Sequence, residues 1–320
     1  MTRRDWLRSA AALACATLLA GPATAQTADQ AQMAAMRFEP AMKIGAEGEA
    51  EGQFKYVEDF AFDSSGRLYA TDAAHAWVQV FDKATGAFIT RFGGKGDEDQ
   101  HLEKPEGIAI APDGSIFIAD YTTGYVKKYD GDHNWLLTFS EYGEGPGQNI
   151  KSEFMSIHDG KLYMPEVGSS RVDVFDLDGK FLFLFGGAGS QPGQMNNPES
   201  AKANSEGRIY VADLKNDRIQ VFDKDGKFLF LFGSSGSAPG QLAAPAGIAF
   251  DKDGNVYVTE IGNDRVSVFD KAGGFITSFG SGAVFENLHG IAVDPETGLV
   301  YVANTGFNRI DVYKPVAGSS

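Results

Sequence analysis

The strongest constraint on this chain is a sequence pattern that recurs about every 47 residues. It is clearest over residues 205–235, SEGRIYVADLKNDRIQVFDKDGKFLFLFGSS, and is repeated from Val256 to Gly280. Repeats at this spacing limit the architecture more than any single motif does. The residues that open the first strand of each unit are Asp59, Gly107, Phe154, Ser200, Gly247 and Gly290. The steps between them are 48, 47, 46, 47 and 43 residues, and the last step is shorter because the loop after Phe279 is trimmed.

Each unit contains short runs of β-branched and aromatic residues separated by polar turns. In the fourth unit these runs are Arg208–Ala212, Arg218–Phe222 and Phe228–Phe232. Runs of this length, bounded by Asp, Asn and Gly, predict consecutive antiparallel strands. Four strands are predicted in the fifth unit, at Gly247–Phe250, Asn255–Thr259, Arg265–Phe269 and Phe275–Phe279. Six such units predict an all-β fold, a six-bladed β-propeller of four-stranded antiparallel blades.

The repeated motif resembles the NHL repeat. Its form Y-V-A-D-x-x-N-x-R-I-x-V-F-D is clearest at Tyr210–Asp223, Tyr257–Asp270 and Tyr301–Tyr313. The Gly pair of Kelch repeats and the Trp-Asp pair of WD repeats are absent from the sequence. The resemblance covers roughly Phe38 to Lys314 and implies a six-bladed NHL-type propeller, while it leaves the function open.

The N-terminal part of this region is predicted to close the ring. The sixth unit stops at Tyr313-Lys314-Pro315 and lacks its outer strand. The segment from Ile44-Gly45 to Gly52-Gln53-Phe54 has the same spacing as the segment from Phe232-Gly233 to Gly240-Gln241-Leu242. We therefore expect the strand before Gly45 to complete the last blade as its outer strand, which removes an open sheet edge.

The first 25 residues are typical of an export leader. Thr2–Arg8 (TRRDWLR) resembles a twin-arginine signal, an Ala- and Leu-rich run covers Ser9–Ala20, and Ala23-Thr24-Ala25 is a small-residue cleavage site. The apolar run is too short to span a membrane. We expect a signal peptide over 1–25, a tether over 26–37, the propeller over 38–314 and a tail over 315–320. The expected location is the bacterial periplasm or the medium.

Composition restricts the chemistry and the partners. Cys15 is the only cysteine and lies in the leader, so the mature chain is expected to have no disulfide, while lipidation of Cys15 stays open. The net charge is −15, and removal of the leader, with three Arg and one Asp, makes it −17. An acidic surface repels phosphate backbones, so nucleic acid is not expected as a partner. The expected partner of this monomer is a protein, a peptide or a small-molecule ligand.

The residues that precede the six inner strands form the first candidate site. In a propeller they face the mouth of the central channel, on the face that also carries the loops between blades, here called the upper face. They are Glu58, Glu106, Glu153, Glu199, Ala246 and His289. Converging carboxylates predict a divalent cation site for Ca²⁺ or, with the imidazole, Zn²⁺. The alternative is a ring of hydrated carboxylates in a wide channel, and without a cation some of their pKa values would rise.

A second set of residues ends the second strand of each unit: Asp72, Asp120, Glu166, Asp213, Glu260 and Asn304. An arginine follows five residues later in the last four units, at Arg171, Arg218, Arg265 and Arg309. We expect these acidic side chains to fix turns by hydrogen bonds to nearby backbone, with the arginines pairing locally. The first two units have Trp77 and Tyr125 in the arginine position. With Tyr121 they predict an aromatic patch that grips a peptide or a sugar, and packing between blades is the alternative.

Two enzyme classes follow from the resemblance. Peptidyl-hydroxyglycine lyases of this family bind zinc through three inner-strand histidines, and only His289 has a comparable position here. Metal-dependent six-bladed lactonases use Glu, Asn and Asp ligands, for which Glu106 or Glu153 could serve. The leading hypothesis is an exported ligand- or protein-binding propeller that uses its upper face and channel mouth. The alternative is a metal-dependent lyase or lactone hydrolase at the same place.

Overall fold

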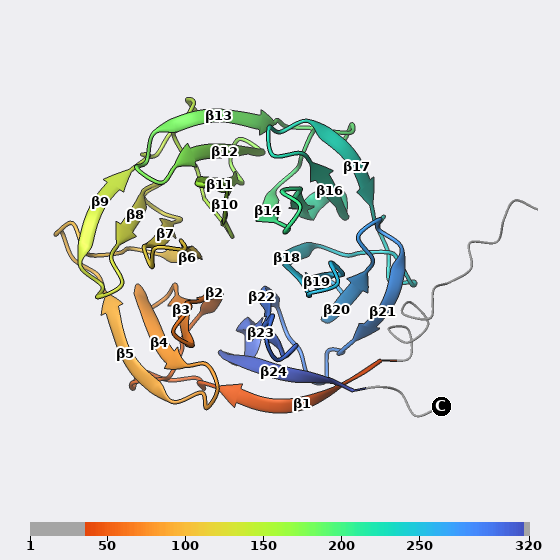
Figure 1. Cartoon of the computed structure of the whole chain (residues 1–320), viewed down its shortest axis with the longest axis horizontal. Helices are drawn as coiled ribbons and strands as arrows, with labels where there is room; N and C mark the ends of the chain where they lie inside the picture. The colour runs from red at the N-terminus through yellow and green to blue at the C-terminus, as the bar shows by residue number, and fades with distance from the viewer. Residues whose placement is uncertain (1–35, 317–320) are drawn as a thin grey trace, which may run out of the picture.

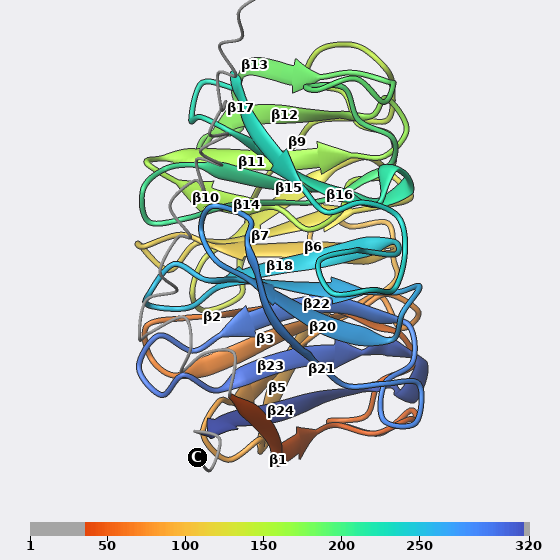
Figure 2. The same ribbon diagram turned by 90° about the vertical axis from the view of Figure 1, so that its right-hand side faces the viewer.

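The computed structural model describes residues 36–316, which form six four-stranded antiparallel sheets around a central axis (Figure 1). Seen edge-on in Figure 2, the strands of each blade run across the thickness of the ring. The only helical elements in this range are the three-residue 3₁₀ turns η1 (Leu214–Asn216) and η2 (Thr305–Phe307), so it contains no helix that could span a bilayer. The predicted fold class is confirmed.

The first five blades follow the chain from the inner strand to the rim. Blade one comprises β2 (Val57–Phe62), β3 (Arg67–Asp72), β4 (Trp77–Asp82) and β5 (Phe88–Gly93). Blade two comprises β6 (Pro105–Ile110), β7 (Ile116–Asp120), β8 (Val126–Tyr129) and β9 (Trp135–Phe139). Blade three comprises β10 (Ser156–His158), β11 (Lys161–Glu166), β12 (Arg171–Asp176) and β13 (Phe181–Gly186). Blade four comprises β14 (Pro198–Ala203), β15 (Ile209–Asp213), β16 (Arg218–Phe222) and β17 (Phe228–Phe232). Blade five comprises β18 (Pro245–Phe250), β19 (Val256–Glu260), β20 (Arg265–Phe269) and β21 (Phe275–Phe279).

Most inner strands begin two residues earlier than predicted. In blades one, two, four, five and six a β-bulge separates the first pair of residues from the rest of the ladder, as between Pro245 and Ile248. The sequence pattern marks only the regular part of the strand, because a bulge adds unpaired residues on one side. Blade three differs, since β10 starts at Ser156, two residues after the predicted Phe154.

The sixth blade joins the two ends of the described chain. It contains β22 (Leu288–Val293), β23 (Val300–Asn304), β24 (Arg309–Val316) and, outermost, β1 (Arg37–Ile44). β1 pairs antiparallel with β24 from Arg37↔Val316 to Ile44↔Ile310, as predicted. These strands begin one residue before and end two residues after the predicted propeller range of 38–314. The predicted leader and nearly all of the tether lie outside the described residues, as do the last residues of the tail.

The core consists of apolar layers between neighbouring blades, and the tyrosine of the repeated motif is part of most layers, with Phe117 in its place in blade two. Tyr163, Tyr210 and Tyr301 lie in the second strands with at most 1% of their surface exposed. Their hydroxyls donate to backbone carbonyls of the next blade, at Lys224 (2.9 Å), Lys271 (3.2 Å) and Lys83 (3.1 Å). A buried tyrosine needs such a partner for its hydroxyl, so this residue of the motif joins adjacent blades.

The inner edges of blades three and four are joined directly, next to the channel. Phe154 N–H donates to Glu199 O, and Ala201 N–H donates to Phe154 O, both at 3.0 Å. This backbone bonding uses the residues before β10, which explains the late start of that strand. Below it, Lys202 of blade four reaches across the ring to Asp59 of blade one, with Nζ 3.4 Å from Oδ2. The same ammonium donates to Met155 O at 2.9 Å.

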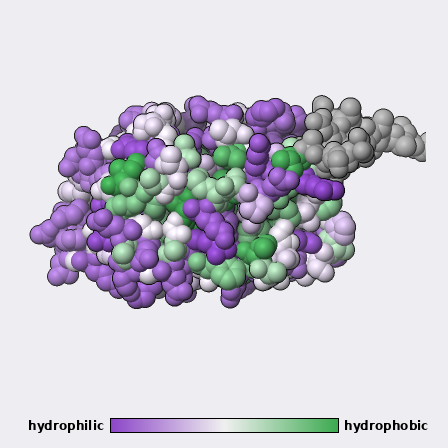
Figure 3. Space-filling model, turned by 90° about the horizontal axis from the view of Figure 1, so that it is seen from below, coloured by the Kyte–Doolittle hydropathy of each residue, from purple (hydrophilic) through white to green (hydrophobic). Residues whose placement is uncertain are grey.

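The side of the ring that carries β1 and β24 is shown in Figure 3. Apolar side chains lie there in small groups separated by polar ones, without one continuous apolar area. One of the exposed apolar residues on the molecule, Val284, with 45% of its surface exposed, belongs to the loop before blade six.

Candidate functional site

The acidic residues that end the second strands fix the loops that lead into each blade. Each is fully buried and accepts a hydrogen bond from a backbone N–H about 17 residues earlier in the chain. The donor–acceptor distances are Tyr56–Asp72 3.1, Glu103–Asp120 2.6, Ile150–Glu166 3.1, Asn196–Asp213 2.6, Ala243–Glu260 3.0 and Glu286–Asn304 3.0 Å. The predicted bonding of these residues to nearby backbone is therefore present in all six blades. Because each bonded loop carries a channel-mouth residue, these bonds position the candidate site.

Three of the four repeated arginines bind the same loops. Arg218 pairs with Asp213, with Nε 2.8 Å from Oδ2, and its terminal nitrogens donate to carbonyls of the preceding loop. Arg171 and Arg265 do the same with Glu166 and Glu260. In blade six the arginine does not pair with the residue that ends the second strand. The residue that would accept from Arg309 is the neutral Asn304, and Arg309 pairs instead with Asp311.

Removing one of these carboxylates should lower stability and not only binding. We expect Asp213→Ala to cost about 2–4 kcal/mol of unfolding free energy, because it leaves Arg218 and a buried N–H without their acceptor. Urea unfolding followed by tryptophan fluorescence measures the change. Asp225→Ala, at an exposed carboxylate paired with Lys224, is the matched control and should unfold at nearly the same urea concentration as the parent. Equal losses in the two variants would contradict this role.

The four glutamates and the histidine at the channel mouth are buried. Their exposed fractions are 4% for Glu58, 3% for Glu106, 5% for Glu153, 7% for Glu199 and 7% for His289. Each stands at the start of an inner strand, where a bulge or loop turns its side chain toward the axis. The carboxylates are therefore not hydrated side chains of a wide channel, as the second interpretation of the sequence supposed.

Burial and mutual repulsion keep these carboxyl groups protonated at higher pH than usual. Burial, with a smaller contribution from the charge of Glu106, raises the pKa of Glu199 to about 8. Burial and the neighbouring carboxylates also raise the pKa of Glu58 and of Glu153 well above the ordinary value. Burial raises the pKa of Glu106 as well, although the ammonium of Lys104 opposes it. The mouth thus holds more carboxyl groups than it can keep ionised without an additional cation.

Among residues 36–316, the one ammonium that pairs with this cluster is that of Lys104, and it is held by a carboxylate and an aromatic ring. Lys104 forms an ion pair with Glu106, and its Nζ lies 4.1 Å from the ring centre of Tyr121. Lys151 approaches the same ring at 5.4 Å. Through these contacts Tyr121 lies beside the glutamate cluster. Burial and the nearby carboxylates Glu153 and Glu106 raise the pKa of Tyr121 to about 12.

His289 is a neutral imidazole that reaches the centre of the ring. Its Nδ1 lies 3.0 Å from Thr305 Oγ1, and Thr305 donates its own proton to Val57 O at 2.7 Å. The hydroxyl oxygen can therefore accept from Nδ1–H, which leaves the lone pair on Nε2. Burial lowers the pKa of His289 to about 4. Its ring meets that of Phe154, from the opposite blade, edge to face at 6.1 Å.

The other two predicted aromatic residues lie elsewhere. Trp77 is stacked between His75, at 4.4 Å between ring centres, and the guanidinium of Arg91, at 3.6 Å. Tyr125 is 39% exposed on blade two. The structure brings only Tyr121 of the three to the glutamates, and the patch of Trp77, Tyr125 and Tyr121 stays a prediction. A residue that the sequence did not single out, Tyr56, lies at the mouth with its ring 6.3 Å from that of His289.

The cation-site prediction was tested against the geometry of the described residues. Between residues 36 and 316, no three His, Cys, Asp or Glu side chains are close enough together to share one metal ion. The zinc site of three histidines does not fit either, because His75 bonds to Asp72 and Glu49 in blade one, away from His289. A site for Ca²⁺ or Zn²⁺ at Glu58, Glu106, Glu153, Glu199 and His289 stays a prediction.

Comparisons with known proteins agree with this architecture. The DUF5128 family model, a 6-bladed beta-propeller, matches residues 194–279. The probable peptidyl-alpha-hydroxyglycine alpha-amidating lyase pgal-1 of Caenorhabditis elegans is 29% identical over 115 residues, 35% of this chain and 32% of that protein. These matches support a β-propeller family. The chain thus aligns with about a third of the length of this curated relative.

Solved propellers match over most of the chain. A structural genomics protein of unknown function from Bacteroides thetaiotaomicron has a TM-score of 0.68 at 16% identity, covering 88% of this chain and 76% of its own. Virginiamycin B lyase from Staphylococcus aureus has a TM-score of 0.63 at 13% identity, covering 88% and 100%. Its catalytically inactive variant with quinupristin has a TM-score of 0.62 at 12% identity, with the same coverage. At such identities the likeness concerns the fold.

Proposed function

We propose that this chain is an exported NHL-type propeller that binds a small-molecule or peptide ligand at the channel mouth through a cationic group of the ligand. The observation that carries the proposal is the convergence of four buried glutamates from four blades, with Lys104 as the one ammonium of the described part of the chain that pairs with them. Buried carboxylates are costly without a counter-charge. A ligand cation supplies that charge and is selected by it.

Lys104 shows how an ammonium group can be held here. Its Nζ contacts the carboxylate of Glu106 on one side and the face of Tyr121 on the other, the two kinds of partner that bind organic cations. Glu58, Glu153 and Glu199 offer the same chemistry to an ammonium or guanidinium of a ligand. Such a group needs hydrogen-bond acceptors and not the short, regular coordination distances of a metal ion, so it suits carboxylates that are spread around a ring.

A metal-assisted lyase or lactone hydrolase is the second candidate. The partial match to an amidating lyase and the neutral imidazole of His289 favour it. With a free Nε2 lone pair, His289 can accept a proton from a bound substrate, as a general base does. A divalent ion, if bound by the glutamates, would polarise an oxygen of the substrate, and both functions share one site.

The test is binding and metal content of the chain from Gln26 onward, purified without chelator or histidine tag. We expect spermidine to bind in calorimetric titration at pH 9, and Glu153→Gln or Glu199→Gln to weaken it at least about tenfold, because each removes a buried charge partner. Glu206→Gln, an exposed carboxylate of blade four, is the control and should leave binding unchanged.

Three other results separate the candidates. About one divalent ion per chain, lost in Glu106→Ala, together with lactone or lyase turnover lost in His289→Gln, would favour the enzyme. Binding of Ca²⁺ or Zn²⁺ but not of spermidine would support the predicted metal site and reject an organic cation as the ligand. No binding of spermidine, calcium or zinc would contradict a cation site at the channel mouth.

A further inference from the structure

The loop that leads into blade six is four residues shorter than the loop into blade five. Phe232 and Leu242 flank the longer loop and are ten positions apart, whereas Phe279 and Phe285 flank the shorter one and are six apart. Leu242 and Phe285 are both fully buried and occupy corresponding places. The missing residues correspond to the Ala-Pro-Gly-Gln part of the longer loop.

In blades three, four and five the corresponding loop binds an arginine. Arg265 donates from its terminal nitrogens to Ser237 O (2.7 Å) and Gln241 O (2.8 Å). Arg218 donates in the same way to Ser190 O (2.8 Å), Gln191 O (3.1 Å) and Gln194 O (2.8 Å). Arg171 binds the carbonyls of Glu144, Gly145 and Gln148. The carbonyl oxygens of one turn thus satisfy the outer end of each guanidinium.

Arg309 is the corresponding residue of blade six, and its loop lacks that turn. Its Nε donates to Asp311 Oδ1 at 2.8 Å, and its guanidinium lies 4.8 Å from the ring centre of Phe307. In residues 36–316 its two terminal nitrogens have no hydrogen-bond acceptor. Five N–H donors need partners in a guanidinium, so the outer end of Arg309 is available to an acceptor from outside.

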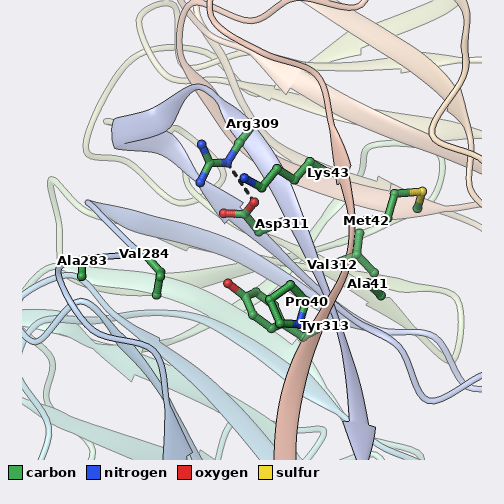
Figure 4. Close-up of a pocket in the computed structure, with 10 residues that line it drawn as sticks. All are labelled: Pro40, Ala41, Met42, Lys43, Ala283, Val284, Arg309, Asp311, Val312 and Tyr313. Atoms are coloured by element: carbon green, nitrogen blue, oxygen red, sulfur yellow. Dashed lines mark hydrogen bonds and ion pairs between the residues drawn. The ribbon is translucent and has the colours of Figure 1, made fainter.

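A pocket of about 410 Å³ lies beside Arg309. Figure 4 shows Arg309 and Lys43 next to Asp311, with Ala283 and Val284 of the shortened loop across the pocket. Pro40 and Tyr313 form an apolar part of the wall. The pocket therefore combines free hydrogen-bond donors with apolar surface. It lies beside Arg309, where blades three to five have the longer loop that binds the corresponding arginine.

We propose that this pocket binds a peptide turn of a partner protein, whose backbone carbonyl oxygens accept hydrogen bonds from the terminal nitrogens of Arg309. The partner's turn then takes the place of the four missing residues. Backbone carbonyls fit better than a carboxylate because Asp311 already balances the charge of Arg309, as Asp213 does for Arg218. The apolar wall suits a proline-containing turn, like Ala238-Pro239-Gly240 of blade five. The site is separate from the channel mouth and does not depend on the function proposed there.

The probe is a blocked peptide with the sequence of residues 234–242, SSGSAPGQL, which is the blade-five loop itself. In titrations followed by NMR or calorimetry we expect it to bind the full chain, and Arg309→Gln to weaken binding at least about tenfold. Arg208→Gln, at a half-exposed arginine of blade four, is the matched control and should bind as the parent does.

A second variant keeps Arg309 and fills the pocket from within. Replacing Ser281–Val284 (SGAV) by the sequence of residues 234–241 (SSGSAPGQ) restores the missing length. We expect this chain to lose peptide binding and to melt at a higher temperature than the parent. Both results would support the pocket as the place of a missing turn, even if Arg309→Gln failed to fold.

Several outcomes would overturn the proposal. They are no peptide binding at millimolar concentration, equal binding by the parent and the Arg309→Gln chain, or continued binding by the chain with the restored loop. Binding of succinate but not of the peptide, lost in Arg309→Gln, would make the pocket an anion site and also reject a peptide turn as its ligand.

Discussion

A chain that starts at Gly45, and so lacks β1, is expected to lose its cooperative thermal unfolding transition. β1 covers the outer edge of β24 with pairs from Arg37↔Val316 to Ile44↔Ile310, and Ile44 is fully buried in the layer between blades six and one. Phe38 stacks on Phe279 of blade five at 4.0 Å, so β1 also joins two blades. We expect a loss of about 5 kcal/mol or more, which approaches the whole stability of many domains.

Scanning calorimetry and size-exclusion chromatography measure this effect. A chain that starts at Met36 keeps β1 and is the matched control, with an unfolding transition like that of the full chain. The truncated chain should also associate, because the edge of β24 would be free to pair with other strands. Adding a peptide of residues 36–45 should restore part of the transition. A truncated monomer that unfolds at the same temperature as the control would show that β1 is not needed for ring closure.

The second large effect is a change in how stability depends on pH. The pKa of Glu199 is about 8 in the folded chain, against an ordinary value of 4.5, so folding favours its protonated form. That contribution to stability is fully present below pH 4.5 and is lost as the pH rises through 8. Glu199→Gln removes this dependence. We expect its stability relative to the parent to rise by about 2–4 kcal/mol between pH 4.5 and pH 9.

The contribution of His289 to stability changes with pH in the opposite direction over part of this range. Its pKa of about 4 in the folded chain lies below the ordinary value of 6.5, so its contribution to stability is present above pH 6.5 and is lost as the pH falls through 4. Between about pH 4.5 and 6.5 the contribution of His289 partly offsets that of Glu199, to which the raised pKa values of Glu58, Glu106 and Glu153 add. The parent should therefore lose stability slowly up to pH 6.5 and faster above it.

Urea titrations at a series of pH values measure these slopes. His289→Gln should make the decline between pH 4.5 and 6.5 steeper than in the parent, and Glu199→Gln should make the decline up to pH 9 shallower. Glu206→Gln should follow the parent throughout. Parallel curves for the parent and Glu199→Gln would mean that the carboxyl group of Glu199 is ionised normally in the folded chain.

The fold could be read from the sequence because its decisive contacts are local and repeated. Third and fourth strands such as Arg218–Phe222 and Phe275–Phe279 were predicted to the residue, since the turns on both sides are marked by Asp and Gly. Closure by β1 followed from the shared spacing of Gly45, Gly52 and Gln53 with the other loops. The inner strands were placed less well, because bulges and, at Phe154, bonding to a neighbouring blade depend on contacts far apart in the chain.

The position of the candidate site could be predicted from the sequence, but the burial and contacts of its side chains could not. The repeat placed Glu58, Glu106, Glu153 and Glu199 around one axis, yet their burial depends on how closely six blades approach one another. The position of Lys104 over Tyr121 joins the loop that leads into blade two to the turn between β7 and β8 of the same blade, and the repeat pattern does not predict this contact. Arg309 shows the same limit: its motif matches the other arginines, and only the structure reveals that its acceptors are missing.

The ion pair between Lys202 and Asp59 crosses the central axis and so lies between the two faces of the ring. A side chain from blade four meets one from blade one across the axis, so we expect a molecule at the channel mouth to enter and leave through the upper face. We expect its exchange to depend on the upper-face loops. Substitutions in the turns of the opposite face can accumulate without altering what the channel mouth admits.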